Sequence, residues 1–314
     1  MSFASDVKDE ISRVELTDEL KKARLCGLFQ SLASLTISSN GVGLILKSTN
    51  ANVARRVGLD LKDLYEVRSE FIVSKQKNLD KRNIYRMVID DKALEILNDL
   101  DLWTDKGLQD HPRMSFLNNE EMIKAYLAGL FLANGSVNSP STSSYHLEIK
   151  ANSIKHGEFI IRLLEKFNIS PKITERRNAQ IVYIKAGDKI ADFLKMIGAH
   201  QAVLHYEDIR IQRDFSNSLS RLNNIDIANE QKIQASADKQ IIAISYLKEK
   251  DLMKLLSEKE REIAQIRFEN PEASLSALSE LYYHHTGQQL TKSGIRHRLD
   301  KILALAEKFQ DKER

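Results

Sequence analysis

The chain has 314 residues, of which 42% are hydrophobic and 29% are charged, with 12 glycines and 4 prolines. This composition excludes a collagen-like or largely disordered chain and predicts about two globular domains, at ~150 residues per domain. The net charge of +3 is too small to indicate a binding partner, so only the distribution of charge along the chain is informative.

Three further features limit where the protein acts. The single cysteine, Cys26, excludes an intrachain disulfide and a zinc site built from thiolates. Residues 1–6 lack the charged and apolar regions of a secretory signal peptide. The longest apolar run, residues 125–133, is about half the ~20 residues that a membrane span requires. We therefore expect a cytoplasmic protein without membrane contact.

A short segment recurs 102 residues further along the chain. Residues 25–29 read Leu-Cys-Gly-Leu-Phe, and residues 127–131 read Leu-Ala-Gly-Leu-Phe. Each copy precedes the same series of patterns: a strand-like run that ends in a lysine, a helix, two extended runs and a closing helix. A chance match of five residues would not repeat this order. The series covers residues 42–47, 51–65, 70–74, 84–89 and 92–102, and again residues 145–150, 154–168, 172–175, 180–185 and 188–197.

This order predicts an α+β domain made of two αββαββα repeats, at about residues 20–102 and 123–200. Beyond about residue 205 the patterns are entirely helical. Residues 207–222 and 228–250 predict two helices, and the polar segment 223–226 between them predicts a linker. We expect the duplicated domain to cover residues 1–222, and the linker with an all-α domain to cover residues 223–314.

Three more helices are predicted in the C-terminal part. The first begins at Ser257-Glu258-Lys259-Glu260, which has the form of a capping box, and ends before Pro271. The second runs from Ser274 to His285, and Gly287 is a suitable left-handed C-cap. Thr291 is the expected N-cap of the third helix, whose apolar residues recur at helical spacing.

The recurring segment contains pairs of small residues on a predicted helix. Ala128 and Gly129 allow another backbone to approach closely, and Cys26 and Gly27 offer the same surface in the first copy. Two such helices can pack directly against each other and join two pseudo-symmetric halves. Residues 127–135 resemble the LAGLIDADG motif of homing endonucleases, and the resemblance covers about residues 20–200 in two copies.

The resemblance implies a metal-binding acidic residue at the base of each of the two helices. The corresponding positions hold Leu32 and Asn134, and the earlier acidic positions of the motif hold Gln30 and Leu132. Hydrolysis of DNA by this route needs anionic oxygen ligands for Mg²⁺, which an amide and an aliphatic side chain do not supply. We therefore expect no bound metal, no other cofactor and no enzymatic activity.

Both predicted hairpins carry an excess of positive charge. Residues 70–87 contain five bases and two acids, and residues 172–185 contain four bases and one acid, so each hairpin has a charge of +3. A hairpin can be basic for solubility alone, but the recurrence at matched positions favours contacts with DNA phosphates. The candidate residues are Lys75, Lys77, Lys81, Arg82 and Arg86 in the first hairpin, and Arg176, Arg177 and Lys185 in the second.

The last two predicted helices have the layout of a helix-turn-helix, at about residues 274–308. The charge between residues 291 and 301 is +3, although residues 251–314 as a whole contain 11 bases and 11 acids. The alternative is an amphipathic helix whose exposed face carries these bases. Residues 257–309 resemble the DNA-binding region 4 of sigma factors. The candidate DNA-binding residues are Thr291, Lys292, Ser293, Arg296, His297, Arg298 and Lys301.

Two degenerate LAGLIDADG repeats followed by a helix-turn-helix resemble the WhiA family of bacterial proteins over essentially the full length. Residues 2–10 match locally, and residues 292–299 (Lys-Ser-Gly-Ile-Arg-His-Arg-Leu) are the most specific match. The resemblance implies a non-catalytic, sequence-specific DNA-binding protein that regulates transcription. It also implies a role in cell division, chromosome segregation and, in some lineages, sporulation.

The implied partners are double-stranded DNA and RNA polymerase or other transcription regulators, at a nucleoid-associated location; no small-molecule substrate is evident. Two other functions stay open from the sequence. A metal-dependent endonuclease would nick plasmid DNA in Mg²⁺. A protein-interaction scaffold would show no salt-dependent binding to duplex DNA.

Overall fold

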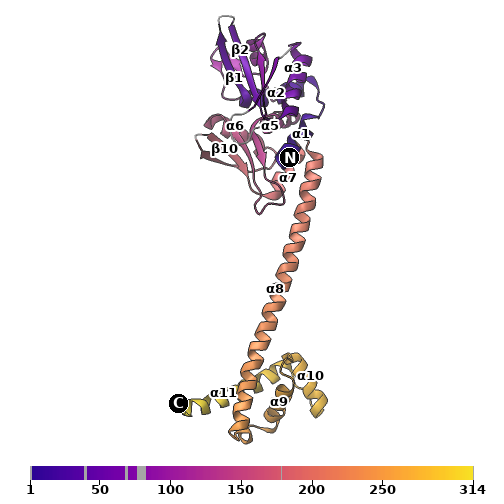
Figure 1. Cartoon of the computed structure of the whole chain (residues 1–314), viewed down its shortest axis with the longest axis vertical. Helices are drawn as coiled ribbons and strands as arrows, with labels where there is room; N and C mark the ends of the chain where they lie inside the picture. The colour runs from indigo at the N-terminus through magenta and orange to yellow at the C-terminus, as the bar shows by residue number, and fades with distance from the viewer. Residues whose placement is uncertain (1, 39–40, 68–69, 76–82, 178, 314) are drawn as a thin grey trace. The chain divides into compact units, whose positions relative to one another are not determined.

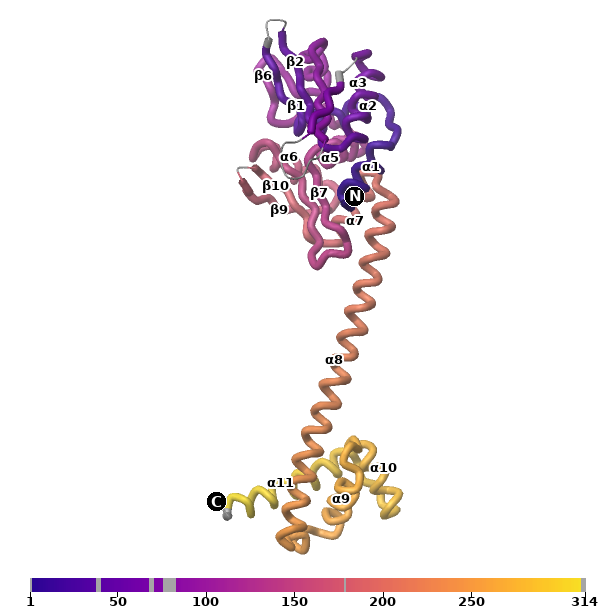
Figure 2. The backbone as a smooth tube through the Cα atoms, viewed as in Figure 1, coloured from indigo at the N-terminus to yellow at the C-terminus, as the bar shows by residue number. Residues whose placement is uncertain are grey.

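The computed structural model describes residues 2–38, 41–67, 70–75, 83–177 and 179–313. It separates into two compact units, Met1–Asp214 (unit 1) and Phe215–Arg314 (unit 2). Figures 1 and 2 show the course of the chain through both units. The boundary between the units falls inside one helix, earlier in the chain than the boundary expected between residues 222 and 223.

Unit 1 contains two αββαββα repeats after a short N-terminal helix, α1 (Phe3–Ser12). The order of elements is the same in both repeats, so the predicted duplication is confirmed. The first repeat consists of α2 (Asp18–Leu32), β1 (Ala33–Ser38), β2 (Gly41–Ser48), α3 (Ala51–Tyr65), β3 (Glu70–Lys75), β4 (Asn83–Ile89) and α4 (Ala93–Asp99). The second consists of α5 (Glu120–Asn134), β7 (Gly135–Val137), β8 (Leu147–Ala151), α6 (Ile154–Glu165), β9 (Lys172–Arg176), β10 (Ala179–Ile184) and α7 (Gly187–Met196).

Each repeat forms a four-stranded antiparallel sheet. The strand orders are β1-β2-β4-β3 and β7-β8-β10-β9, which are equivalent by the duplication. A two-stranded hairpin, β5 (Trp103–Thr104) with β6 (Gly107–Leu108), lies between the repeats in the sequence. Figure 1 shows both sheets on the left of unit 1 and the helices α1 and α3 on its right. Helices α2, α3 and α4 pack against the first sheet, and α5 and α6 pack against the second.

The two repeats meet along α2 and α5. A Cβ atom added to Gly27 would overlap the carbonyl oxygen of Tyr126, and one added to Gly129 would overlap the carbonyl oxygen of Arg24. The two backbones are thus in direct contact, which confirms the predicted interface between the halves. From Ala125 to Leu132, helix α5 is apolar on all sides and buried, and Asn119 caps the helix by accepting from the Met122 amide at 2.9 Å.

A buried ion pair fixes α2 against α3. The Arg24 guanidinium donates from Nη2 to Asp60 Oδ2 at 2.7 Å and from Nη1 to the Val14 carbonyl at 2.9 Å. Both side chains are almost fully buried, and burial lowers the pKa of Arg24 and raises the pKa of Asp60. Such a pair stabilises the structure only when both partners are present, because either charge alone would be buried without compensation.

Helix α8 (His200–Glu249) is continuous over 50 residues, so the predicted break at residues 223–226 is wrong. The segment Asn-Asn-Ile-Asp contains neither glycine nor proline. Asparagine and aspartate each lower helix stability by less than about 0.7 kcal/mol relative to alanine, which the turns on both sides can offset. The predicted linker is therefore helical, and α8 belongs to unit 1 up to Asp214 and to unit 2 from Phe215.

Unit 2 contains the end of α8, the 3₁₀ turn η1 (Met253–Leu255) and the helices α9 (Glu258–Glu269), α10 (Leu275–Thr286) and α11 (Lys292–Glu313). The predicted capping box at residues 257–260 is present, and Gly287 has a φ of 72° at the C-cap of α10. These helices surround one core, formed by Ala243, Ile244, Leu247, Leu256, Ile263, Ala264, Ile266, Leu278, Tyr282, Ile295, Leu299, Ile302 and Ala306.

Candidate nucleic-acid interface

Alternate residues of the first sheet point away from the helices. In β2, Leu44 and Leu46 are buried, whereas Lys47 on the opposite face is exposed. Lys47 pairs in register with Arg86 of β4, so two cations lie directly opposite each other on the outer face. Like charges in this position destabilise a sheet, and a bound anion removes the repulsion. The arrangement is suited to a phosphate.

The second sheet also carries cations on its outer face, although none lies directly opposite another in the described register. The register aligns Lys150 with Ile181 and Lys172 with Tyr183. The Nζ atom of Lys185 lies 5.4 Å from the centre of the Tyr183 ring. The outer face also carries Arg176, whose guanidinium lies 4.0 Å from its acidic neighbour Glu148. Four bases against one acid leave this face with an excess of positive charge: Lys150, Lys172, Arg176 and Lys185 against Glu148.

The structure divides the predicted hairpin residues into four groups. Arg86, Arg176 and Lys185 lie on the outer faces of the two sheets. Lys75 is exposed at the end of β3, in register with Asn83 and on the other face. Arg177 occupies the turn between β9 and β10, with a φ of 51°. The remaining three residues, Lys77, Lys81 and Arg82, lie outside the described residues.

Three outer-face lysines were not among the predicted site residues: Lys47, Lys150 and Lys172. Lys47 and Lys150 are the lysines that end the strand-like runs recognised in the sequence of the two repeats. The alternation of core-facing and outward-facing residues from Leu44 onward in β2, and throughout β8, is the signal that identifies these two lysines, because it places each on the face opposite the core. We call Lys47 and Arg86 with Lys150, Lys172, Arg176 and Lys185 the sheet cations.

The degenerate metal positions lie at the ends of α2 and α5. Leu32 is half-buried against the core, and the Asn134 side-chain amide donates to the Ser31 carbonyl at 3.2 Å. Within the described part of the chain, no group of three or more His, Cys, Asp or Glu side chains is arranged to hold a metal. The donor set at this place, one amide and one aliphatic side chain, does not fit a divalent cation.

A chain of hydrogen bonds connects the two repeats near these positions. The backbone amide of Asn152 donates to His156 Nδ1 at 3.3 Å, so the proton of the neutral ring lies on Nε2. The Nε2 atom is 3.1 Å from the Tyr126 hydroxyl oxygen. The Tyr126 hydroxyl donates to Gln30 Oε1 at 2.7 Å, and the Gln30 amide donates to the Asp110 carbonyl. The side chains at the base of the helices thus bind one another.

Acidification should weaken unit 1 through His156. Burial lowers the pKa of this side chain to about 4, and the charge of His111 adds to the effect. The unfolded chain, with a His pKa of about 6.5, binds the proton first, so stability falls as pH drops from about 6.5 towards 4. Between pH 7 and pH 5 the expected loss is about 2 kcal/mol, measured by urea unfolding. If a His156→Gln variant lost as much unfolding free energy between pH 7 and pH 5 as the unaltered protein does, this assignment would be contradicted.

Helices α10 and α11 form the predicted helix-turn-helix. Thr291 accepts from the Gly294 amide at 3.2 Å, which confirms it as the N-cap of α11. Ile295, Leu299 and Ile302 are fully buried in the core of unit 2. Most of the predicted DNA-binding residues are exposed on the flanks and outer face of α11, namely Lys292, Ser293, Arg296, His297 and Lys301. The Lys301 Nζ atom lies 3.6 Å from the Glu260 carboxylate at the start of α9.

The two arginines of α11 lie in different surroundings. Arg296 is exposed, and its Nε is 3.9 Å from the Asp300 carboxylate, an arrangement that leaves the side chain free to reorient. Arg298 is half-buried and donates from Nη1 to the Gly294 carbonyl of its own helix at 3.0 Å. It also lines a hollow of about 400 Å³ beside the first turn of α9. Arg296 is therefore the better placed of the two to reach outward.

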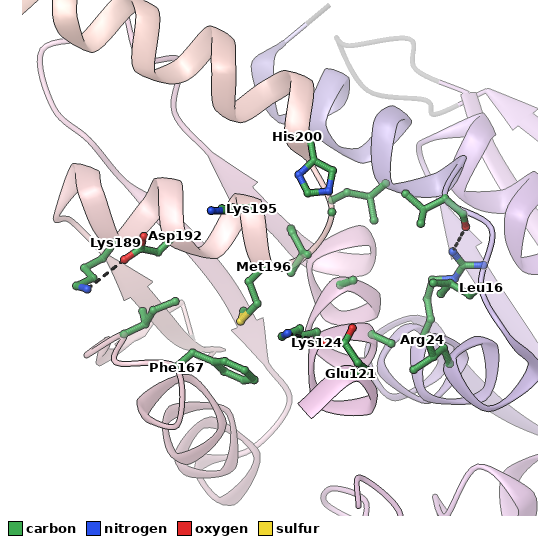
Figure 3. A pocket seen from close by; sticks show the side chains of 18 of the residues that line it. Leu16, Arg24, Glu121, Lys124, Phe167, Lys189, Asp192, Lys195, Met196 and His200 are labelled. Atoms are coloured by element: carbon green, nitrogen blue, oxygen red, sulfur yellow. Dashed lines mark hydrogen bonds and ion pairs between the residues drawn. The ribbon is translucent and has the colours of Figure 1, made fainter. Parts of the chain in front are cut away.

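Figure 3 shows a hollow of unit 1, about 660 Å³ in volume, which lies among α5, α7 and the segment that joins α1 to α2. Its charged side chains are mostly paired with one another. Lys124 is 2.7 Å from Glu121, and Lys189 is 3.1 Å from Asp192. The remaining walls are apolar, for example Phe167. The two acidic side chains of the lining thus compensate two of its lysines.

No helix among the described residues is both long and apolar enough to cross a membrane. Three family models match the chain: the WhiA N-terminal LAGLIDADG-like domain over residues 18–103, the WhiA LAGLIDADG-like domain over residues 123–216, and the WhiA C-terminal HTH domain over residues 219–306. Together they match most of the sequence, and they agree with the predicted fold class and with the helix-turn-helix.

Relatives that match over essentially the whole chain carry the same family name. A protein of Staphylococcus epidermidis named "Probable cell division protein WhiA" is 40% identical and covers 100% of this chain and 99% of its own length. A protein of Latilactobacillus sakei subsp. sakei with the same name is 40% identical over 99% of both chains. The crystal structure of full-length DUF199/WhiA from Thermatoga maritima matches with a TM-score of 0.58 and 26% identity, and covers 98% of this chain and 99% of that chain.

Proposed function

This chain belongs to the WhiA family, and on that premise we propose that it is a sequence-specific DNA-binding protein that regulates transcription. Its relatives are named cell division proteins, and we extend to this chain a role in cell division, chromosome segregation and, in sporulating lineages, sporulation. The observation that carries the proposal is the exposed basic face of α11 within an HTH domain. Lys292, Arg296 and Lys301 are all exposed on this helix, with Lys301 beside the start of α9.

The proposed division of labour follows from the two kinds of surface. Helix α11 reads base edges in the major groove, with Arg296 as the principal reader and Ser293 and His297 beside it. The sheet cations contact phosphates irrespective of sequence. Unit 1 then acts as a non-catalytic clamp and unit 2 as the reader. RNA polymerase or other transcription regulators are proposed partners, at a cytoplasmic, nucleoid-associated location.

Crosslinking of the chain to DNA across the genome tests this function. We expect enrichment at a limited set of sites that share a sequence motif, and duplexes containing that motif should bind the purified protein more tightly than random duplexes of the same length. A matched Arg296→Ala strain should lose the enrichment at the motif. Uniform recovery of all DNA, or recovery of none, would count against a sequence-specific regulator.

No cleavage of DNA is expected with any divalent metal. Leu32 and Asn134 occupy the positions where carboxylates are needed, so the metal that would stabilise the attacking and leaving oxygens has no anionic ligands. The measurement is the conversion of supercoiled plasmid to nicked or linear forms in Mg²⁺ or Mn²⁺. Cleavage by the unaltered protein that disappears in an Asn134→Ala variant would overturn the non-catalytic proposal.

A further inference from the structure

A second hollow of unit 1 lies between α3 and the strands β3 and β4 of the first repeat. Its volume is about 630 Å³, which is within the range of small-molecule sites. Most of the residues that line it are apolar. Two of these side chains are partly exposed to solvent, Leu59 at 41% and Phe71 at 47%. The lining residues are Ala51, Ala54, Arg55, Gly58, Leu59, Lys62, Val67, Phe71 and Tyr85. We call this hollow the α3 pocket.

The duplication supplies an internal comparison for this pocket. Helix α6 of the second repeat corresponds to α3, and strand β9 corresponds to β3. There Ile173 packs onto α6 so closely that a Cβ atom on Gly157 would lie 2.5 Å from the Ile173 Cδ1 atom. Ile161, which occupies the place of Gly58, is packed against the core. Ile173 takes the place of Phe71 and is itself 37% exposed, so the difference between the repeats is Ile161, which occupies the space that Gly58 leaves open.

The rim of the α3 pocket is positively charged. Arg55 and Lys62 are exposed, line the pocket and lie seven residues apart, so they share one face of α3. Neither has an ion pair with any residue that the structure describes, and none of the described lining residues is acidic. The corresponding positions on α6 are Glu158 and Glu165. The cationic rim is therefore particular to the repeat that has the open pocket.

We propose that the α3 pocket binds a small carboxylate with an apolar body. The apolar body occupies the space between α3 and the two strands, where it removes the exposed surface of Leu59 and Phe71 from water. The carboxylate lies at the rim, where Arg55 and Lys62 supply charge-assisted hydrogen bonds. The proposal is independent of DNA binding, because no lining residue belongs to the sheet cations or to α11.

The test uses the full chain, decanoate as the probe and isothermal titration calorimetry. Decanoate should bind saturably with one site per chain, and decyltrimethylammonium, which has the same apolar chain and the opposite charge, should bind at least about tenfold more weakly. The double variant Arg55→Gln with Lys62→Gln should lose about tenfold in decanoate affinity. The matched control on the equivalent helix, Glu158→Gln with Glu165→Gln, should leave the affinity unchanged.

Filling the pocket tests its position. Gly58→Ile, which introduces the residue of the second repeat, should abolish decanoate binding, and Ala51→Leu at the exposed start of α3 provides a second filling variant. Both should bind duplex DNA as the unaltered protein does, which separates this proposal from the proposed function. Absence of saturable decanoate binding, equal binding of the two probes, or unaltered binding in a folded filling variant would overturn it.

Discussion

Replacement of Gly129 by leucine should destabilise unit 1 by about 3 kcal/mol or more. A Cβ atom at this position would overlap the carbonyl oxygen of Arg24, which is backbone and cannot rotate away. The two central helices would have to separate, and α2 and α5 carry the contact between the two repeats. Overpacking of a well-packed core typically costs about 1–3 kcal/mol, and an overlap with backbone lies at the upper end or beyond. Chemical unfolding monitored by far-UV circular dichroism measures the change.

Two alanine variants provide the matched comparison. Gly129 and Gly157 both lie inside helices, but the nearest atom to an added Cβ is the Arg24 carbonyl oxygen in the first case and the Ile173 Cδ1 atom in the second. The isoleucine side chain can change its rotamer. In a helix interior, alanine is also more favourable than glycine by about 1 kcal/mol. Gly129→Ala should therefore destabilise the protein, and Gly157→Ala should change stability little. Equal unfolding midpoints for the two variants would contradict direct backbone packing.

Replacement of Arg296 by alanine should weaken binding to the specific duplex by about 5–150-fold. An arginine that binds guanine in the major groove contributes about 1–3 kcal/mol of discrimination, and 1.4 kcal/mol corresponds to tenfold. Arg296 is exposed in the first turns of α11, the part of a recognition helix that reaches base edges. Binding to a random duplex should change much less, because no specific contact is made there.

Arg298→Ala is the control for this experiment. Its side chain is half-buried and donates to the Gly294 carbonyl of the same helix, so it is less available to DNA. We expect a smaller loss of discrimination than for Arg296. If Arg298→Ala removed the preference for the specific duplex and Arg296→Ala did not, the assignment of the reader would be wrong.

The duplicated domain was predictable because the sequence patterns of its helices and strands are local and occur in two copies. The strand and helix periods are clear in both copies, and the small residues at positions 27 and 129 indicate the contact between the halves. The first strand of each sheet was not among the extended runs identified. Gly135–Val137 has only three residues, and Ala33–Ser38 follows α2 without a turn signal, so neither leaves a strong pattern.

Other features depend on tertiary structure and left no signal in one sequence. The break expected at residues 223–226 rested on local polarity, whereas the continuity of α8 depends on the cooperativity of the turns that flank it. The pairing of Arg24 with Asp60 joins positions 36 residues apart. From the sequence, Arg296 and Arg298 were equally good candidates for contact with DNA. In the structure they differ in exposure, because Arg298 lies beside the start of α9.

The central claim is that α11 reads sequence while the sheet cations hold the backbone, and a salt series tests it most directly. The affinities of the unaltered protein, Arg296→Ala, and Lys47→Gln with Lys150→Gln are measured on specific and random duplexes. The lysine variant should weaken binding to both duplexes alike and reduce the slope of log affinity against log salt by about one unit per lost contact. Arg296→Ala should reduce mainly the ratio between the duplexes. If Arg296→Ala weakened both duplexes equally while the lysine variant affected only the specific one, the account would be contradicted.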